Sequence, residues 1–206
     1  MVKLDGKLAM VVLPSPSRLD FDSPWFGGDL FQAAVGQGSM LSTPVQLASA
    51  YSALVNGGTV WKPRLVDEIR TESGELVTEN PATVVNVVDD LSASTVRSLR
   101  NDRRRVVNDP RRTAHPAFFD FGDNLDQVGG KTGTAEIIKR RVNEDTGEVV
   151  QEAVTTALFV GAAPIDDPDW VVVVIIERGG SGGGIAAPTA KPILQYLLDQ
   201  PVTPVS

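Results

Sequence analysis

The stretch Val128-Gly129-Gly130-Lys131-Thr132-Gly133-Thr134-Ala135-Glu136-Ile137-Ile138 decides how the rest of the chain can be arranged. β-Branched residues at both ends favour a strand, whereas glycines and threonines fill its middle, where a buried strand would carry packed side chains. Glycine in a strand indicates that another group comes close to the backbone. Lys131 adds a positive charge and Gly133 leaves one face open, while Thr132 and Thr134 add hydroxyl groups. The stretch therefore predicts an edge strand that binds an extended peptide ending in a carboxylate.

A nucleotide-binding P-loop is an alternative interpretation, because Gly130-Lys131-Thr132 resembles the end of that motif. The motif also requires a glycine five positions before Gly130, and the sequence has Leu125 there. Chance is a second alternative, since a specified string of four residues occurs in roughly one 200-residue chain in several hundred. The P-loop is thus excluded, and the Lys-Thr-Gly-Thr string needs support from the rest of the chain.

Composition restricts the function classes. The chain has 206 residues, of which 42% are hydrophobic and 22% charged, as is typical of one soluble globular domain. Its net charge of −7 argues against nucleic-acid binding, which needs a basic face. Cysteine is absent and no metal-ligand cluster or cofactor motif is found, so we expect no metal and no cofactor. No apolar run approaches the roughly 20 residues of a membrane span, and no signal peptide is recognised, so any anchor or export signal is expected outside this chain.

The first confident element is a helix that begins at Pro44. Thr43 is a good N-cap, and Gln46 completes a capping box with it. Apolar residues recur at helical spacing on one face, namely Leu47, Ala50, Tyr51 and Leu54. We therefore expect that face to be buried and the helix to end at Gly57-Gly58.

Further elements follow from the patterns downstream. Strands are predicted at residues 60–70, near Leu76 and Val77, and at 84–88. A helix runs from a Ser92 or Ser94 cap to about Val107, with Val96, Leu99 and Val106 inward. Arg97, Arg100 and Arg104 share another face of it, which we interpret as solvated and paired with acids, with an anionic-surface contact as the alternative.

The second half predicts an antiparallel meander. Residues 109–127 read as irregular and 139–148 as a charged loop, while 155–163 and 170–177 read as strands that follow the central stretch. The glycine-rich residues 179–184 predict a loop that passes close to a site. A closing helix is predicted at 188–198, with Ile193, Leu194, Leu197 and Leu198 buried. The fold class is therefore α+β, an antiparallel sheet flanked by helices.

Several ordered pieces of the sequence resemble the transpeptidase domain of penicillin-binding proteins, of the class B, cell-elongation type. The pieces are Pro14-Ser15-Pro16-Ser17-Arg18-Leu19, Val35-Gly36-Gln37-Gly38, Thr43 to Ala48, Asn56-Gly57-Gly58, Thr113-Ala114 with Phe118, Gly130 to Ala135, Phe159 to Pro164, and Gly182-Gly183-Gly184 with Ala186-Ala187-Pro188. This resemblance covers nearly the whole chain. It implies a penicillin-binding/β-lactamase-like fold and a serine acyltransferase that cross-links peptidoglycan stem peptides and is acylated by β-lactams.

The resemblance also assigns roles. Lys131 would stabilise charge and help proton transfer, and the hydroxyl groups of Thr132 and Thr134 would bind the substrate carboxylate. With Gly133 these residues form the third motif of the family, and the Thr134 N–H would be one of two oxyanion donors. The family also needs Ser-x-x-Lys and Ser-x-Asn, and this sequence contains neither. We therefore expect the chain to be a fragment that is inactive alone.

The domain prediction follows from that resemblance. Residues 1–206 would be the C-terminal portion of one transpeptidase domain: a connector loop at 1–30, a helical and insert region at 31–127, and core strands with the closing helix at 128–200. Implied partners are stem peptides, β-lactams, the missing N-terminal part of the domain and a cell-elongation glycosyltransferase. The implied location is the extracytoplasmic face of the bacterial membrane.

Alternatives remain at this point. The chain could be a non-catalytic binding or scaffold relic of the same fold, although the intact Lys131 to Thr134 string counts against it. A related D,D-carboxypeptidase or β-lactamase is a further alternative. His115, the only histidine, is predicted to be structural or exposed, and Glu136 and Glu177 are interpreted as solvated carboxylates.

Overall fold

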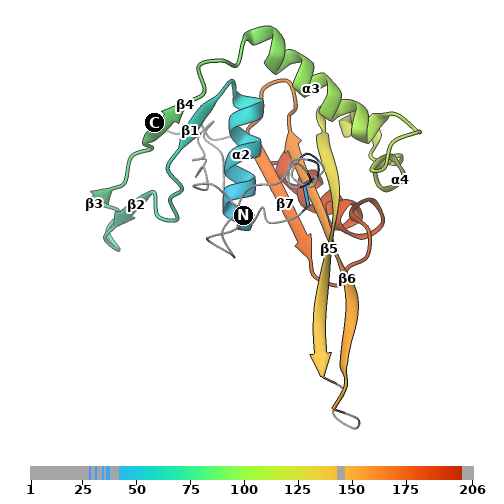
Figure 1. The fold of residues 1–206 in the computed structure, drawn as a ribbon. Coiled ribbons are helices and arrows are strands. Elements are labelled where there is room, and N and C mark those ends of the chain that lie inside the picture. Colours follow the sequence, from blue (N-terminus) through green and yellow to red (C-terminus); the bar gives the residue numbers. More distant parts are fainter. Residues whose placement is uncertain are drawn as a thin grey trace.

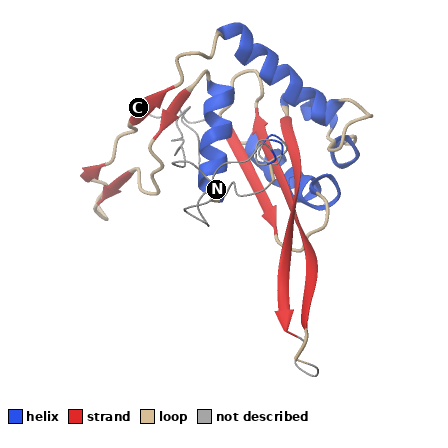
Figure 2. Cartoon of the chain, viewed as in Figure 1, coloured by secondary structure: helices blue, strands red, loops and turns tan. Residues whose placement is uncertain are grey.

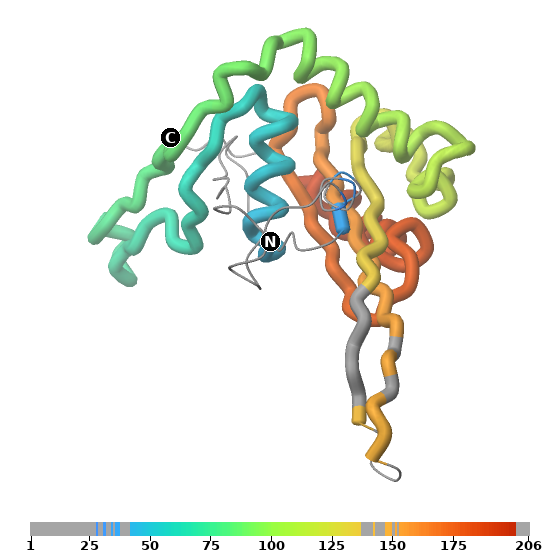
Figure 3. The backbone as a smooth tube through the Cα atoms, viewed as in Figure 1, coloured from blue at the N-terminus to red at the C-terminus, as the bar shows by residue number. Residues whose placement is uncertain are grey.

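The computed structural model describes residues 42–142 and 147–200, together with Gly28, Phe31, Ala34, Gly36 and Gln37. Within these ranges, the side chains of residues 137–141, 150 and 152 are not described. Except for Gly28, the predicted connector at 1–30 lies outside the described residues, as does the tail at 201–206. Figure 3 traces the backbone and colours the residues whose side chains are also described.

A three-stranded antiparallel sheet forms the centre of the molecule (Figure 1). Its strands are β5 (Gly129–Val142), β6 (Val149–Ala163) and β7 (Trp170–Ile176), in the order β5-β6-β7. The predicted meander is thus confirmed, with β5 at one edge of this sheet.

The charged loop predicted at 139–148 is wrong at residues 139–142, which belong to β5, whereas residues 147 and 148 lie outside any strand as predicted. Residues 143–146 of that prediction lie outside the described residues. β5 and β6 stay paired from Gly129 opposite Ala162 to Val142 opposite Val149, and Figure 1 shows the two strands projecting as a ribbon beyond β7. Ladder hydrogen bonds use only backbone groups, so they can continue through a charged sequence. The charged residues therefore did not mark the end of the strand.

Helix α2 (Pro44–Asn56) covers one face of the sheet (Figure 1). Its capping box is confirmed: the Gln46 N–H donates to Thr43 Oγ1 at 3.2 Å, and the Thr43 N–H donates to Gln46 Oε1 at 2.8 Å. Gly57 ends the helix in the left-handed conformation, with φ of 96°. The predicted inward face is wrong at Leu54, which is 39% exposed, whereas Ser49 and Ser52 are buried. The buried residues of α2 are Ser49, Tyr51, Ser52, Ala53 and Val55, so its buried face only partly coincides with the predicted apolar stripe.

Helix α3 (Ala93–Asn108) lies across β5 and begins at its predicted N-cap, Ser92. Val96 and Val107 are buried, while Leu99 and Val106 are half-buried. The predicted solvated face is correct for Arg97, which is exposed. Arg100 and Arg104 instead join elements, because Arg100 Nε donates to the Val55 carbonyl at 2.8 Å and Arg104 Nε to the Asp126 carbonyl at 2.9 Å.

The opposite face of the sheet carries the larger core, closed by α5 (Ala187–Leu198). Phe118, Phe159, Leu194 and Leu197 are its largest fully buried side chains. The predicted closing helix is confirmed, although Ile193 and Leu198 are only partly buried.

The irregular segment predicted at 109–127 contains two short helices, α4 (His115–Phe118) and η1 (Gly122–Gln127). They bring Phe118 and Phe121 into edge contact in the core, with ring centroids 5.4 Å apart. His115 has the predicted structural role, because its Nδ1 atom lies 3.0 Å from the Val107 carbonyl oxygen.

A separate strand region extends beside α2 (Figure 2). β1 (Thr59–Trp61) pairs with β4 (Val84–Val87), and β2 (Glu68–Arg70) pairs with β3 (Leu76–Glu79). The single strand predicted at 60–70 is therefore two strands. Pro63 lies between them, and its missing N–H removes one ladder donor.

Candidate functional site

The edge strand β5 presents Lys131 with its ammonium group folded back on the strand. Its Nζ atom donates to the Thr132 carbonyl oxygen at 2.6 Å. Lys131 is exposed as a residue, but partial desolvation of its ammonium group, and then the charge of Arg103 nearby, hold the pKa of Lys131 below its usual range. A lysine in this environment gives up a proton more easily than one in water.

Thr132 meets a residue from outside its own strand. The loop between α3 and α4 brings Thr113 to it, and their Oγ1 atoms lie 2.6 Å apart. The sequence pieces included Thr113 but gave it no role, because nothing local links two threonines 19 positions apart. One hydroxyl donates to the other, so one proton of this pair is still available to a ligand.

Thr134 is held by the glycine-rich loop. The Gly182 N–H donates to Thr134 Oγ1 at 3.3 Å, at the start of η2 (Gly182–Ala186). A Cβ atom on Gly182 would clash with the carbonyl oxygens of Gly133 and Leu158, and one on Gly183 would clash with that of Thr113. The predicted close approach of this loop is therefore confirmed, and the approach is made to backbone.

These elements enclose a pocket of about 350 Å³. Its lining consists of Thr113, Pro116, Thr132, Gly133, Thr134, Ser181, Gly183 and Gly184. Ser181 Oγ accepts from the Gly184 N–H at 3.1 Å, just as Thr134 Oγ1 accepts from Gly182. Because these oxygens already accept, their own protons can point to a ligand, and a carboxylate is an acceptor that such hydroxyl donors suit.

The glycines of β5 serve different purposes. A Cβ atom on Gly130 would come within 2.5 Å of the Phe159 ring, and one on Gly129 within 2.5 Å of Ile165. Gly129 and Gly130 therefore make room for the protein's own core. A Cβ atom on Gly133 would meet Leu158 only at ordinary contact distance, 3.4 Å, so Gly133 fits the predicted open position.

The remaining candidate carboxylates do not line this pocket. Glu136 and Glu177 are exposed. Among the described residues, no group of three potential metal ligands is found, and no helix is long and apolar enough to cross a membrane.

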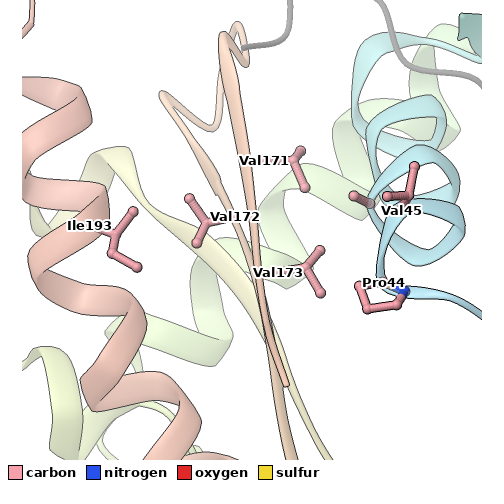
Figure 4. A pocket seen from close by; sticks show the side chains of 7 residues that line it. Pro44, Val45, Val171, Val172, Val173 and Ile193 are labelled. Carbon is pink, nitrogen blue, oxygen red and sulfur yellow. The ribbon is translucent and has the colours of Figure 1, made fainter. Parts of the chain in front are cut away.

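A second pocket, of about 270 Å³, lies at the β7 edge of the sheet (Figure 4). Val171 and Val173 point toward Pro44 and Val45 of α2, while Val172 and Ile193 lie on the other side of the strand. Its lining side chains are apolar and offer no reactive group.

Comparison with known proteins identifies the chain's relatives. The family model described as "Penicillin binding protein transpeptidase domain" matches residues 16–195. The chain is 32% identical over 182 residues to the peptidoglycan D,D-transpeptidase MrdA of Haemophilus influenzae, which covers 87% of this chain and 27% of that protein. It is 29% identical to the penicillin-binding protein PbpB of Mycolicibacterium smegmatis, covering 98% of this chain and 31% of that protein.

Solved structures agree with the fold. The crystal structure of Pseudomonas aeruginosa PBP2 in complex with WCK 5153 matches with a TM-score of 0.61 and 28% identity, over 89% of this chain and 35% of that one. PBP3 of Mycobacterium tuberculosis, complexed with aztreonam, matches with a TM-score of 0.60 and 25% identity, over 91% of this chain and 40% of that one. The chain thus spans about a third or less of the length of the curated relatives above.

Proposed function

The chain belongs to the transpeptidase family of penicillin-binding proteins and is similar to class B, elongation-type members of it. We therefore propose that it forms one wall of a peptidoglycan D,D-transpeptidase site. The hydroxyl-lined pocket beside β5 is the observation that carries this proposal. In it, the carboxylate of the terminal D-alanine of a stem peptide, or that of a β-lactam, accepts hydrogen bonds from Thr132 and Thr134.

Each residue of the motif has a part in this proposal. Lys131 supplies positive charge and proton transfer, and Gly133 lets the extended peptide lie against β5. The Thr134 N–H is one of the two donors that stabilise the oxyanion during acyl transfer. Thr113 joins this set through its contact with the Thr132 hydroxyl.

The test is a titration of the chain with an acylated D-Ala-D-Ala peptide, followed by amide NMR. We expect the signals of Thr132, Gly133 and Thr134 to shift with the free acid. The matched ligand is the same peptide with a C-terminal amide, which keeps its shape and removes the charge. Equal shifts with both peptides, or none with the acid, would contradict the carboxylate role.

We further propose that these 206 residues alone are not acylated by a β-lactam, because the sequence contains neither Ser-x-x-Lys nor Ser-x-Asn. Carboxylate binding without a positioned nucleophile and base leaves the chemical step unassisted. Intact-mass analysis after incubation with benzylpenicillin should show the unmodified mass. A stable adduct would prove that a nucleophile within the chain suffices.

The domain boundaries and the setting belong to the same proposal. Residues 31–127 would form the helical and insert region and 128–200 the core strands with the closing helix of one transpeptidase domain, preceded by the connector at 1–30. The site would act on the extracytoplasmic face of the bacterial membrane, where stem peptides are cross-linked, with a cell-elongation glycosyltransferase as partner. Protease accessibility of the native protein in intact spheroplasts tests this location.

A further inference from the structure

A second positive charge lies close to Lys131. Side chains alternate along a strand, so Gly129 and Lys131 share a face of β5 and lie about 7 Å apart along it. A Cβ atom on Gly129 would come within 3.1 Å of Arg103 Cβ. Helix α3 thus lays the half-buried Arg103 side chain over the strand, two residues before Lys131.

Neither of these two cations has a carboxylate partner in residues 42–142 and 147–200. The ion pair that α3 makes to the β6–β7 connection uses Arg104, whose Nη2 atom lies 2.7 Å from Asp166 Oδ2. Lys131 donates to a carbonyl oxygen instead. Two like charges without a counter-ion each disfavour the charged form of the other, and lysine rather than arginine is the one that can lose its proton.

Neighbouring side chains on other elements do not neutralise the two positive charges of Arg103 and Lys131. Helix α2 contributes Tyr51, whose hydroxyl is buried; burial raises the pKa of Tyr51, and the charge of Arg103 opposes that rise. Directly across from Lys131, β6 carries the apolar Val160. The other charged side chains on the neighbouring parts of these elements are Arg100, Asp102 and Arg104 of α3, Asp126 of η1 and Glu136 of β5. The two arginines are held by main-chain carbonyls, and the three acids are exposed.

We propose that Arg103 is a positioning residue of this site, which acts through Lys131 by making the ammonium group ready to release a proton. During acyl transfer an N–H bond of Lys131 would break, the proton would pass to the departing amine nitrogen, and the electron pair would stay on Nζ. The attacking nucleophile would release its own proton to solvent, and solvent would return one proton to Lys131 Nζ, so no net proton is gained or lost. This inference rests on the proposed function, because it assigns the control of proton release in that same site.

The experiment measures the protonation of Lys131 directly. The whole chain is labelled with trace acetic anhydride across pH 7 to 11, with an unstructured lysine peptide as internal standard, and acetylation at Lys131 is followed by peptide mass spectrometry. We expect the labelling midpoint of Lys131 to lie at lower pH than that of the standard. Arg103→Met, which keeps the apolar stem and removes the charge, should move the midpoint to higher pH.

Two variants serve as controls. Arg103→Lys keeps a positive charge and should leave the midpoint of Lys131 near that of the wild type. Arg105→Met removes an exposed charge elsewhere on α3 and should also leave the midpoint of Lys131 near that of the wild type. Circular dichroism establishes that each variant is folded.

Two results would overturn the proposal: a wild-type Lys131 midpoint no lower than the standard, or an Arg103→Met midpoint that does not rise. The first needs no variant, so it can overturn the proposal even if Arg103→Met does not fold. Labelling uses no substrate, so a failure here leaves the carboxylate test unaffected, and a failure of peptide binding leaves this result standing.

Discussion

At the scale of single residues, Thr113 is a side chain whose place beside Thr132 only the structure shows. Its Oγ1 atom lies 2.6 Å from that of Thr132, in the wall of the hydroxyl-lined pocket. Thr113→Val keeps the shape and removes this partner, so a hydrogen bond worth about 1 kcal/mol is lost from the set. We expect the Kd for the D-Ala-D-Ala acid to rise roughly 5-fold in the NMR titration.

The matched control for this prediction is Thr83→Val, the same change at an exposed threonine in the strand region beside α2. It should bind the peptide like the wild type. Unchanged binding by Thr113→Val would remove Thr113 from the site. Equal weakening of the acid and amide peptides would mean that Thr113 shapes the pocket without contributing to carboxylate recognition.

At the scale of elements, the glycine-rich loop and β5 fit together only without a side chain at position 182. A Cβ atom there would clash with the carbonyl oxygens of Gly133 and Leu158, which are backbone atoms that cannot rotate away. We expect Gly182→Ala to lower the free energy of unfolding by about 1 to 3 kcal/mol, as overpacking does. Urea unfolding followed by circular dichroism measures this loss.

Gly184→Ala is the control within the same loop. A Cβ atom on Gly184 would meet only Ser181 Oγ, an atom at the end of a side chain that can rotate. This variant should therefore be much less destabilised than Gly182→Ala. If the two variants unfold at the same urea concentration, the close packing at Gly182 does not set the position of the loop.

The helices and strands also show which features of the fold and the site could be predicted from the sequence alone. The start of α2 was predictable because its capping box involves residues three positions apart, Thr43 and Gln46. The burial of α2 was predictable only in part, since Tyr51 is buried as expected whereas Leu54 is exposed through the way α2 packs on other elements. For the same reason the Lys-Thr-Gly-Thr strand could be recognised as a motif, whereas the positions of Thr113 and Arg103 beside it depend on chain folding over many residues.

At the scale of the whole molecule, the two edges of the sheet differ in character. The β5 edge carries Lys131 and the threonines, while β7 pairs only with β6 among the described residues and has an apolar pocket beside it (Figure 4). An unpaired strand edge next to apolar side chains favours association between chains. We therefore expect this chain to self-associate at micromolar concentrations through its β7 edge.

A pair of charge substitutions tests that expectation by sedimentation velocity. Val45 lines the pocket and is 46% exposed, so Val45→Glu places a charge where a second chain would dock and should shift the population toward monomer. Leu65 is 98% exposed but lies outside the pocket, so Leu65→Glu removes more exposed apolar surface without affecting the edge. If association followed exposed apolar area alone, Leu65→Glu would be the more effective change. A monomer produced by Leu65→Glu and not by Val45→Glu would thus assign the association to the strand region beside α2, and the β7 edge would not be the docking surface.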